Sequence, residues 1–104
     1  MEFIEFPDEI ASISLWKRQQ LSDLICTRLD CSENSVKRDL ADAKAMLESG
    51  EIVAEDCPVL TGSKRNFWLP IEAVRFLWYY RQVVQTYGNR AVAKEYIKKN
   101  GVPL

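Results

Sequence analysis

Histidine is absent from this chain of 104 residues, and cysteine, glycine and proline are scarce. The chain therefore lacks the side chain most often used for acid–base catalysis near neutral pH, which is also the commonest zinc ligand. Its three cysteines include no Cys-x-x-Cys pair, so we expect reduced thiols rather than a disulfide framework or a zinc site. Because no nucleophile–base pair, phosphate-binding glycine loop or metal cluster is visible, we predict a protein that is not an enzyme and needs no cofactor.

Long hydrophobic runs are also missing. No stretch approaches the about 18 apolar residues of a membrane span, and the first residues are acidic where a signal peptide is basic. Apolar residues make up 47% of the chain and charged residues 28%, as in an ordinary globular domain. We therefore expect one compact cytoplasmic domain with a modest core and no membrane partner.

An excess of charge of one sign is missing overall, because the formal net charge is only −1. The average conceals two unlike halves. Residues 1–60 carry six basic and thirteen acidic side chains, whereas residues 61–104 carry eight basic and two acidic ones. This asymmetry indicates a nucleic-acid or acidic partner. The acidic half would repel DNA unless its carboxylates face away from it.

Apolar spacing predicts two helices joined by a short turn. Apolar residues recur at helical intervals over 20–29 and again over 33–48. Asp30 and Cys31 interrupt the pattern, and Ser32 is a good N-cap for the second helix. The predicted buried stripe consists of Leu21, Leu24, Ile25 and Leu29 in the first helix and Val36, Leu40, Ala43 and Leu47 in the second.

The segment after these helices predicts a β-hairpin. Extended residues over 52–60 and 67–69 flank a turn over 61–66. Lys64 and Arg65 would stand at its basic tip, where they would contact phosphates or the minor groove of DNA. A solvated turn without a partner is the alternative.

Two further helices are predicted, over 71–87 and 90–100, with a break at Gly88-Asn89. The first of them has an apolar surface too wide for one neighbour in so small a domain, so we expect a second copy of the chain to cover part of it. Trp78, Tyr79, Tyr80 and Val83 form an aromatic patch, which fits core and interface packing or stacking on unpaired bases. The predicted dimer interface consists of Val74, Leu77, Trp78, Tyr80, Arg81 and Val84.

A short helix, a tight turn and a second helix with a polar start are typical of a helix-turn-helix. Short polar and basic side chains at the start of the second helix would contact base edges and phosphates in the major groove. Lys17 and Arg18, just before the first helix, would contact the flanking backbone or remain an unused exposed pair. A helical hairpin that serves only as core is the alternative for the whole motif. The candidate contacts of the second helix are Ser32, Asn34, Ser35, Lys37 and Arg38.

The run from Ser32 to Leu40 resembles the recognition helix of DeoR-type bacterial regulators. There a Ser-x-x-Thr/Ser-Val/Ile-Lys/Arg-Arg-Asp-Leu pattern is typical, and Ser32, Ser35 and the run 36–40 hold those places. Asp30 stands where such turns usually have glycine, and aspartate adopts the left-handed conformation at some cost.

The run from Arg65 to Leu77 resembles the wing and following helix of the MerR family, and the break at Gly88-Asn89 falls where that family turns into its next short helix. Two features depart from that family. Some fifteen residues precede the helix-turn-helix, and there is no room for a long dimerisation helix or an effector domain. The resemblance implies a minimal winged-helix regulator without a small-molecule sensor.

These observations predict a mainly α fold, a winged helix-turn-helix with a two-stranded β-hairpin wing and C-terminal dimerisation helices. Residues 1–14 would form an N-terminal arm, 15–70 the DNA-binding domain and 71–104 the dimerisation helices. The predicted function is that of a homodimeric repressor, which binds a palindromic operator in double-stranded DNA with half-sites about 34–36 Å apart. The alternative is a winged-helix protein-interaction module that uses the aromatic patch and does not bind DNA.

Overall fold

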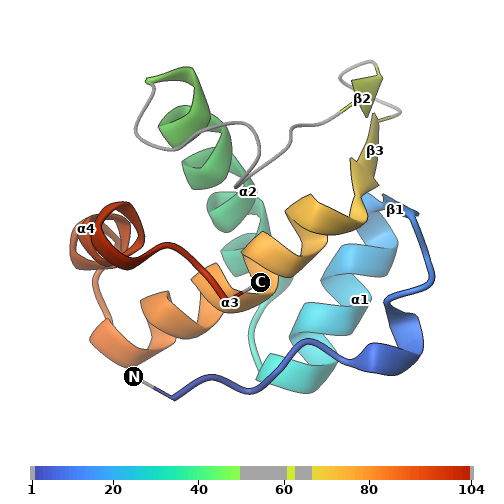
Figure 1. Ribbon diagram of the computed structural model, residues 1–104, viewed down its shortest axis with the longest axis horizontal. Helices are drawn as coiled ribbons and strands as arrows, with labels where there is room; N and C mark the ends of the chain where they lie inside the picture. The colour runs from blue at the N-terminus through green and yellow to red at the C-terminus, as the bar shows by residue number, and fades with distance from the viewer. Residues whose placement is uncertain (1, 50–60, 63–66, 104) are drawn as a thin grey trace.

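The computed structural model describes residues 2–49, 61–62 and 67–103, and its described elements are mainly helical, as predicted (Figure 1). The helices predicted over 33–48, 71–87 and 90–100 are confirmed, whereas the first helix begins two residues earlier than expected. None of the described helices is long and apolar enough to cross a membrane. In chain order the elements are the 3-10 helix η1 (Asp8–Ile10), β1 (Leu15–Lys17), α1 (Arg18–Leu29), α2 (Glu33–Glu48), β2 (Thr61–Gly62), β3 (Phe67–Pro70), α3 (Ile71–Tyr87) and α4 (Arg90–Asn100).

The turn between α1 and α2 follows from two local signals in the sequence. Asp30 adopts the left-handed conformation, with φ 51° and ψ 68°, and is the only residue other than glycine with a positive φ in the described chain. Ser32 then caps α2, because its hydroxyl accepts a hydrogen bond of 3.2 Å from the backbone N–H of Ser35. The chain therefore reverses direction within three residues.

A small antiparallel sheet with strand order β1-β3-β2 stands at one end of the helices. Trp16 lies opposite Leu69 in the register of β1 on β3, and Gly62 lies opposite Phe67 in the register of β2 on β3. The sequence did not single out residues 15–17 as the outer strand. The predicted extended segment over 52–60 lies outside the described residues, as do Lys64 and Arg65.

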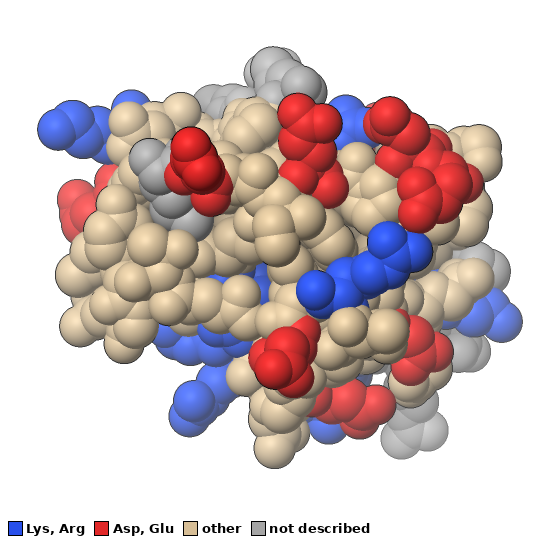
Figure 2. Space-filling model, turned by 90° about the horizontal axis from the view of Figure 1, so that it is seen from below, with Lys and Arg blue, Asp and Glu red and all other residues tan. Residues whose placement is uncertain are grey.

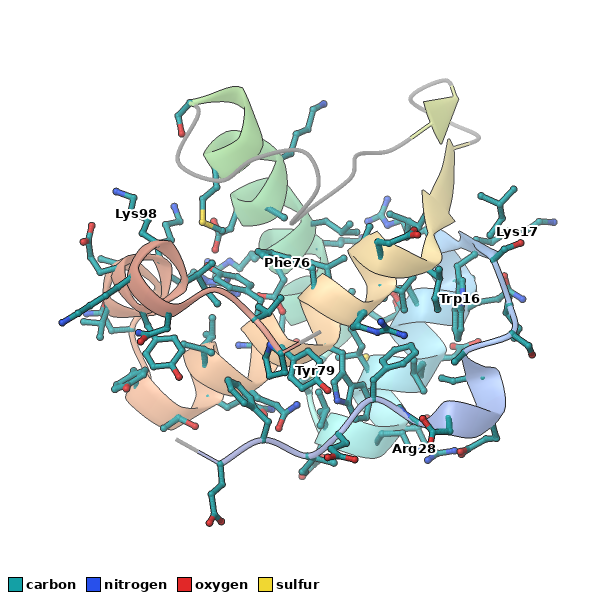
Figure 3. The ribbon with its side chains drawn as sticks, in the orientation of Figure 1. Trp16, Lys17, Arg28, Phe76, Tyr79 and Lys98 are labelled. Atoms are coloured by element: carbon teal, nitrogen blue, oxygen red, sulfur yellow. The ribbon has the colours of Figure 1, made fainter. Side chains whose placement is uncertain are left out.

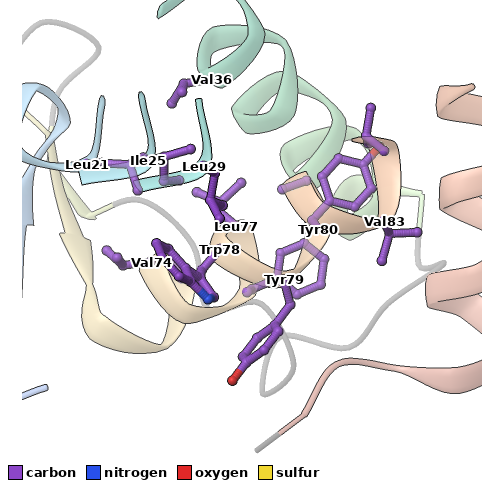
Figure 4. Close-up of a cluster of buried hydrophobic side chains, with 14 of the residues drawn as sticks. Leu21, Ile25, Leu29, Val36, Val74, Leu77, Trp78, Tyr79, Tyr80 and Val83 are labelled. Atoms are coloured by element: carbon purple, nitrogen blue, oxygen red, sulfur yellow. The ribbon is translucent and has the colours of Figure 1, made fainter. Parts of the chain in front are cut away.

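Helix α3 is the centre of the core and contacts α1, α2 and α4 (Figure 4). The prediction that its side chains form a dimer interface is wrong, because the chain buries them itself and leaves each at most 7% exposed. The apolar surface of α3 is wide because three helices and the N-terminal arm cover it. The six residues concerned are Val74, Leu77, Trp78, Tyr80, Arg81 and Val84.

The N-terminal arm lies in an extended conformation along α3 (Figure 3). The indole N–H of Trp78 donates to the carbonyl of Ile4 at 2.7 Å, and the Gln82 side chain binds both the N–H and the carbonyl of Ile4. The Tyr79 hydroxyl accepts from the N–H of Phe6 at 3.1 Å, and the rings of Phe6 and Trp78 meet edge to face. The chain's own arm therefore covers Trp78 and Tyr79 of the aromatic patch.

Candidate nucleic-acid interface

The outer face of α2 is a stripe of exposed side chains spaced three and four residues apart. Among the side chains that the structure describes, the stripe contains three basic residues, one amide and two alanines. Within the part of the chain that the structure describes, its three cations make no ion pair. We call this set the outer stripe: Asn34, Lys37, Arg38, Ala41, Lys44 and Ala45.

The inner face of α2 holds acidic side chains, and these are neutralised inside the molecule. Asp39 is completely buried, and its Oδ1 lies 2.8 Å from Nη1 of Arg90. Its Oδ2 lies 3.4 Å from Nε of Arg81, an ionic contact without a hydrogen bond. Asp42 accepts a second hydrogen bond from Nη1 of Arg90, at 2.7 Å. Arginines of α3 and α4 thus pair with both Asp39 and Asp42 on the inner side of α2.

Tyr80 and Lys94 complete this inner cluster around Asp42. The Tyr80 hydroxyl donates a hydrogen bond of 2.8 Å to Oδ2 of Asp42, and Nζ of Lys94 lies 3.6 Å from Oδ1. Burial raises the pKa of Asp42, but the hydrogen bonds from Arg90 and Tyr80 and the charge of Lys94 outweigh it and keep that pKa below its usual value. Asp42 is therefore ionised at neutral pH.

Asp39 responds differently to the same cluster because it is more deeply buried. Loss of hydration raises the pKa of Asp39 to about 6, against the opposing charges of Arg81 and Arg90. Burial and the acceptor oxygen of Asp42 likewise raise the pKa of Tyr80. The inner cluster therefore contains one carboxyl group that titrates close to neutral pH.

The structure brings some of the predicted contact residues together at the start of α2. Ser32 and Asn34 are exposed, while Ser35 is half-buried and its hydroxyl lies 3.1 Å from that of Ser32. Lys17 and Arg18 are exposed at the start of α1. The wing residues, Lys64 and Arg65, belong to the chain outside the described residues, so the structure does not place them.

One acidic residue shares this end of α2. Glu33 is exposed, and its Oε1 lies 3.4 Å from Nε2 of Gln19, which also donates to Asp23 at 2.9 Å. A polar bridge from α1 thus holds the Glu33 carboxylate. It is the one acid whose exposed side chain the structure describes on α2.

Among the described residues, a group of exposed acids lies on another face of the molecule. Figure 2 shows the face at the bottom of Figure 1, where Asp and Glu side chains gather in several groups with Lys and Arg between them. Exposed acids of the arm and η1 include Glu2, Glu5, Asp8 and Glu9. This face has no single sign of charge and does not resemble a surface for DNA.

Sequence reasoning missed the inner cluster. From the sequence, Asp39 is expected only as part of the run that resembles a recognition helix, and Arg81 as part of a dimer interface. A signal was present, because Asp39 lies three residues after Val36 and so falls on the buried side of the helix. A carboxylate at such a position needs a buried cation, and α3 carries one in the middle of an apolar helix, Arg81.

No family model, curated protein or solved structure matches this chain. Among the residues that the structure describes, no three Cys, Asp or Glu side chains gather closely enough to hold a metal ion. The interface therefore has to be judged from the chemistry of α2 itself.

Proposed function

We propose that this chain is a sequence-specific DNA-binding regulator of the winged-helix type, with α2 as the helix that enters the major groove. One observation carries the proposal. The two faces of α2 are sorted by charge, with Asp39 and Asp42 turned inward onto arginines and three cations left on the outer stripe. Such sorting gives an acidic protein a locally basic surface.

The arrangement around α2 supports this role. Helix α1 packs against α2 across a turn of three residues, the spacing of a helix-turn-helix. Lys37 and Arg38 suit phosphates and guanine edges, Asn34 suits adenine, and the small side chain of Ala41 lets the helix approach the base pairs closely. The antiparallel pairing of β2 with β3 supports a wing beyond α2.

A homodimeric repressor that reads a palindromic operator remains the form of regulator we propose. Its contacts between copies would come from a surface other than the buried side of α3. The alternative is a protein-interaction module that uses the aromatic patch. It has little exposed aromatic surface to use, because the N-terminal arm contacts Trp78 and Tyr79, while Tyr80 is buried and bonded to Asp42 of α2.

Binding to duplex DNA from the region upstream of the protein's own gene tests the proposal. Fluorescence anisotropy at several salt concentrations gives the affinity and its salt dependence. We expect the double variant Lys37→Ala/Arg38→Ala to bind more weakly. Because log K falls as log salt rises, we also expect the magnitude of this slope to decrease by about 2. The matched control is Lys98→Ala/Lys99→Ala, which removes the same charge from an exposed end of α4.

Circular dichroism of both double variants would first show that they fold like the wild type. Equal binding by the wild type and Lys37→Ala/Arg38→Ala would contradict the assignment of α2. Failure of the wild type to bind any duplex at low salt would contradict the function as a whole. Equal losses in both double variants would indicate nonspecific attraction by total charge.

A further inference from the structure

A cavity of about 440 Å³ lies where the N-terminal arm, the first half of α3 and the segment after α4 come together (Figure 1). Its volume falls within the range of about 300–1,000 Å³ that is usual for small-molecule sites. Three segments that are distant in the sequence form its walls, so the cavity exists only in the folded chain. The walls include Phe3, Glu5, Phe6, Asp8, Arg75 and Tyr79.

The apolar part of the wall is aromatic, and its rings are held in place. The rings of Phe3 and Tyr79 meet edge to face, with their centroids 5.1 Å apart. The ring of Phe6 packs edge to face on Trp78 of the core, and the backbone N–H of Phe6 donates a hydrogen bond to the Tyr79 hydroxyl. Fixed aromatic side chains of this kind favour a ligand with an aromatic body.

Arg75 supplies the positive charge of the cavity. Its side chain is half-buried, and its guanidinium lies over the Phe6 ring, 5.5 Å from the centroid. Within the described chain, Arg75 makes neither an ion pair nor a hydrogen bond. The ring therefore orients the guanidinium but leaves its N–H donors for another partner. A planar guanidinium with such donors binds a carboxylate through two parallel hydrogen bonds.

Glu5 and Asp8 supply two negative charges to the same cavity. Both side chains are exposed, and neither forms an ion pair with Arg75, although all three residues line the cavity. The opposite charges are therefore too far apart to pair directly. A ligand that carries a carboxylate at one position and an ammonium group at another can pair with both.

We propose that this cavity binds a free α-amino acid with an aromatic side chain. The carboxylate of the ligand pairs with Arg75, and its ammonium group pairs with Glu5 or Asp8. Its ring lies against Phe3 and Tyr79. Both charges of the ligand are needed, which distinguishes an amino acid from a simple acid or amine of similar shape. The site uses no residue of the outer stripe, so its test does not depend on DNA binding.

Titration of the isotope-labelled full-length chain with L-phenylalanine, followed through amide chemical shifts, tests the site. We expect saturable shifts in the N-terminal arm and in the first half of α3. Two analogues of similar shape each lack one charge, since phenylpropionate has no ammonium group and phenylethylamine has no carboxylate. Because each analogue loses a charge-assisted hydrogen bond, we expect each to bind about tenfold more weakly than phenylalanine.

Arg75→Met removes the guanidinium and keeps most of the side-chain volume. In this variant we expect phenylalanine to lose its advantage over phenylethylamine, because no group is left to pair with the carboxylate. Binding of phenylethylamine should not be weakened. The matched control is Arg38→Met, which removes an exposed cation from α2 and should leave all affinities unchanged. Circular dichroism would show whether both variants are folded.

The proposal is overturned if phenylalanine gives no saturable shifts in the wild type up to its solubility limit, or shifts only outside the arm and α3. It is also overturned if both analogues bind the wild type as tightly as phenylalanine, or if Arg75→Met and Arg38→Met bind phenylalanine equally well. If Arg75→Met does not fold, the comparison of the three ligands on the wild type decides by itself.

Discussion

The two faces of α2 handle charge in opposite ways. On the inner face, Asp39 and Asp42 are enclosed by cations from α3 and α4 at 2.7–3.6 Å. On the outer face, Lys37, Arg38 and Lys44 reach solvent. Buried charges of this kind determine how a helix is seated, whereas exposed ones contribute little to folding and remain available to a partner. The same helix is thus fixed from one side and available for binding from the other.

Of the changes proposed for the two faces of α2, replacing Arg81 by methionine should have the largest effect on the free energy of unfolding. The change keeps most of the side-chain volume but removes a buried cation 3.4 Å from Asp39. Because a buried carboxylate loses one of its two partners, we expect the free energy of unfolding at pH 7 to fall by about 3 kcal/mol. Urea titration followed by tryptophan fluorescence measures it.

The control for this change is Arg28→Met. Arg28 pairs with Glu9 at 3.2 Å, and both side chains are about half exposed, so we expect no measurable loss of stability. Equal losses in Arg81→Met and Arg28→Met would contradict the contrast between buried and exposed charge on which the role of the inner cluster depends.

The pH dependence of stability should show a smaller effect of the same cluster. The pKa of Asp39 is about 6 in the folded protein, against 3.8 as the ordinary value. Between these values the folded protein holds a proton that the unfolded chain has released, so the contribution of Asp39 is fully present below about 3.8 and is lost as the pH rises through about 6. The slope is at most about 1.4 kcal/mol per pH unit.

Asp39→Asn isolates this contribution, because asparagine has nearly the same shape and does not titrate. Urea titrations between about pH 4 and 7 give the unfolding free energy of both proteins. We expect the wild type to lose stability relative to Asp39→Asn as the pH rises through this window. A relative gain would mean that Arg81 and Arg90 outweigh burial and hold the pKa of Asp39 below its ordinary value.

Local signals explain why the helices could be predicted from the sequence. Ser32 caps α2, and Pro70 stands directly before α3. Asn89 caps α4 by accepting hydrogen bonds from the N–H groups of Ala91 and Val92. Each of these signals acts within a few residues, so it can be recognised without knowing the rest of the fold.

The packing partners of the helices could not be predicted in this way, because they depend on contacts between distant segments. The wide apolar surface of α3 correctly indicated burial on more than one side, but a second copy of the chain was the wrong partner. The true partner includes an arm that lies more than 70 positions earlier, where Ile4 meets Gln82 and Phe6 meets Tyr79. Residues of the arm have no periodic pattern that could assign them to α3. The pairing of Asp39 with Arg81 could not be predicted for the same reason, because the two residues lie far apart in the sequence.

The smallest expected effect on folding is that of Lys44→Ala, which tests the outer face of α2. Lys44 is exposed, and within the described chain it has no ionic partner. We therefore expect the unfolding free energy to change by less than about 0.5 kcal/mol. The magnitude of the slope of log K against log salt for DNA binding should decrease by about 1. Lys94→Ala, which removes the same group from the inner cluster at Asp42, should reverse the pattern, with a small loss of stability and an unchanged slope. If both variants changed the slope equally, the two faces of α2 would not differ in the way that their charges indicate.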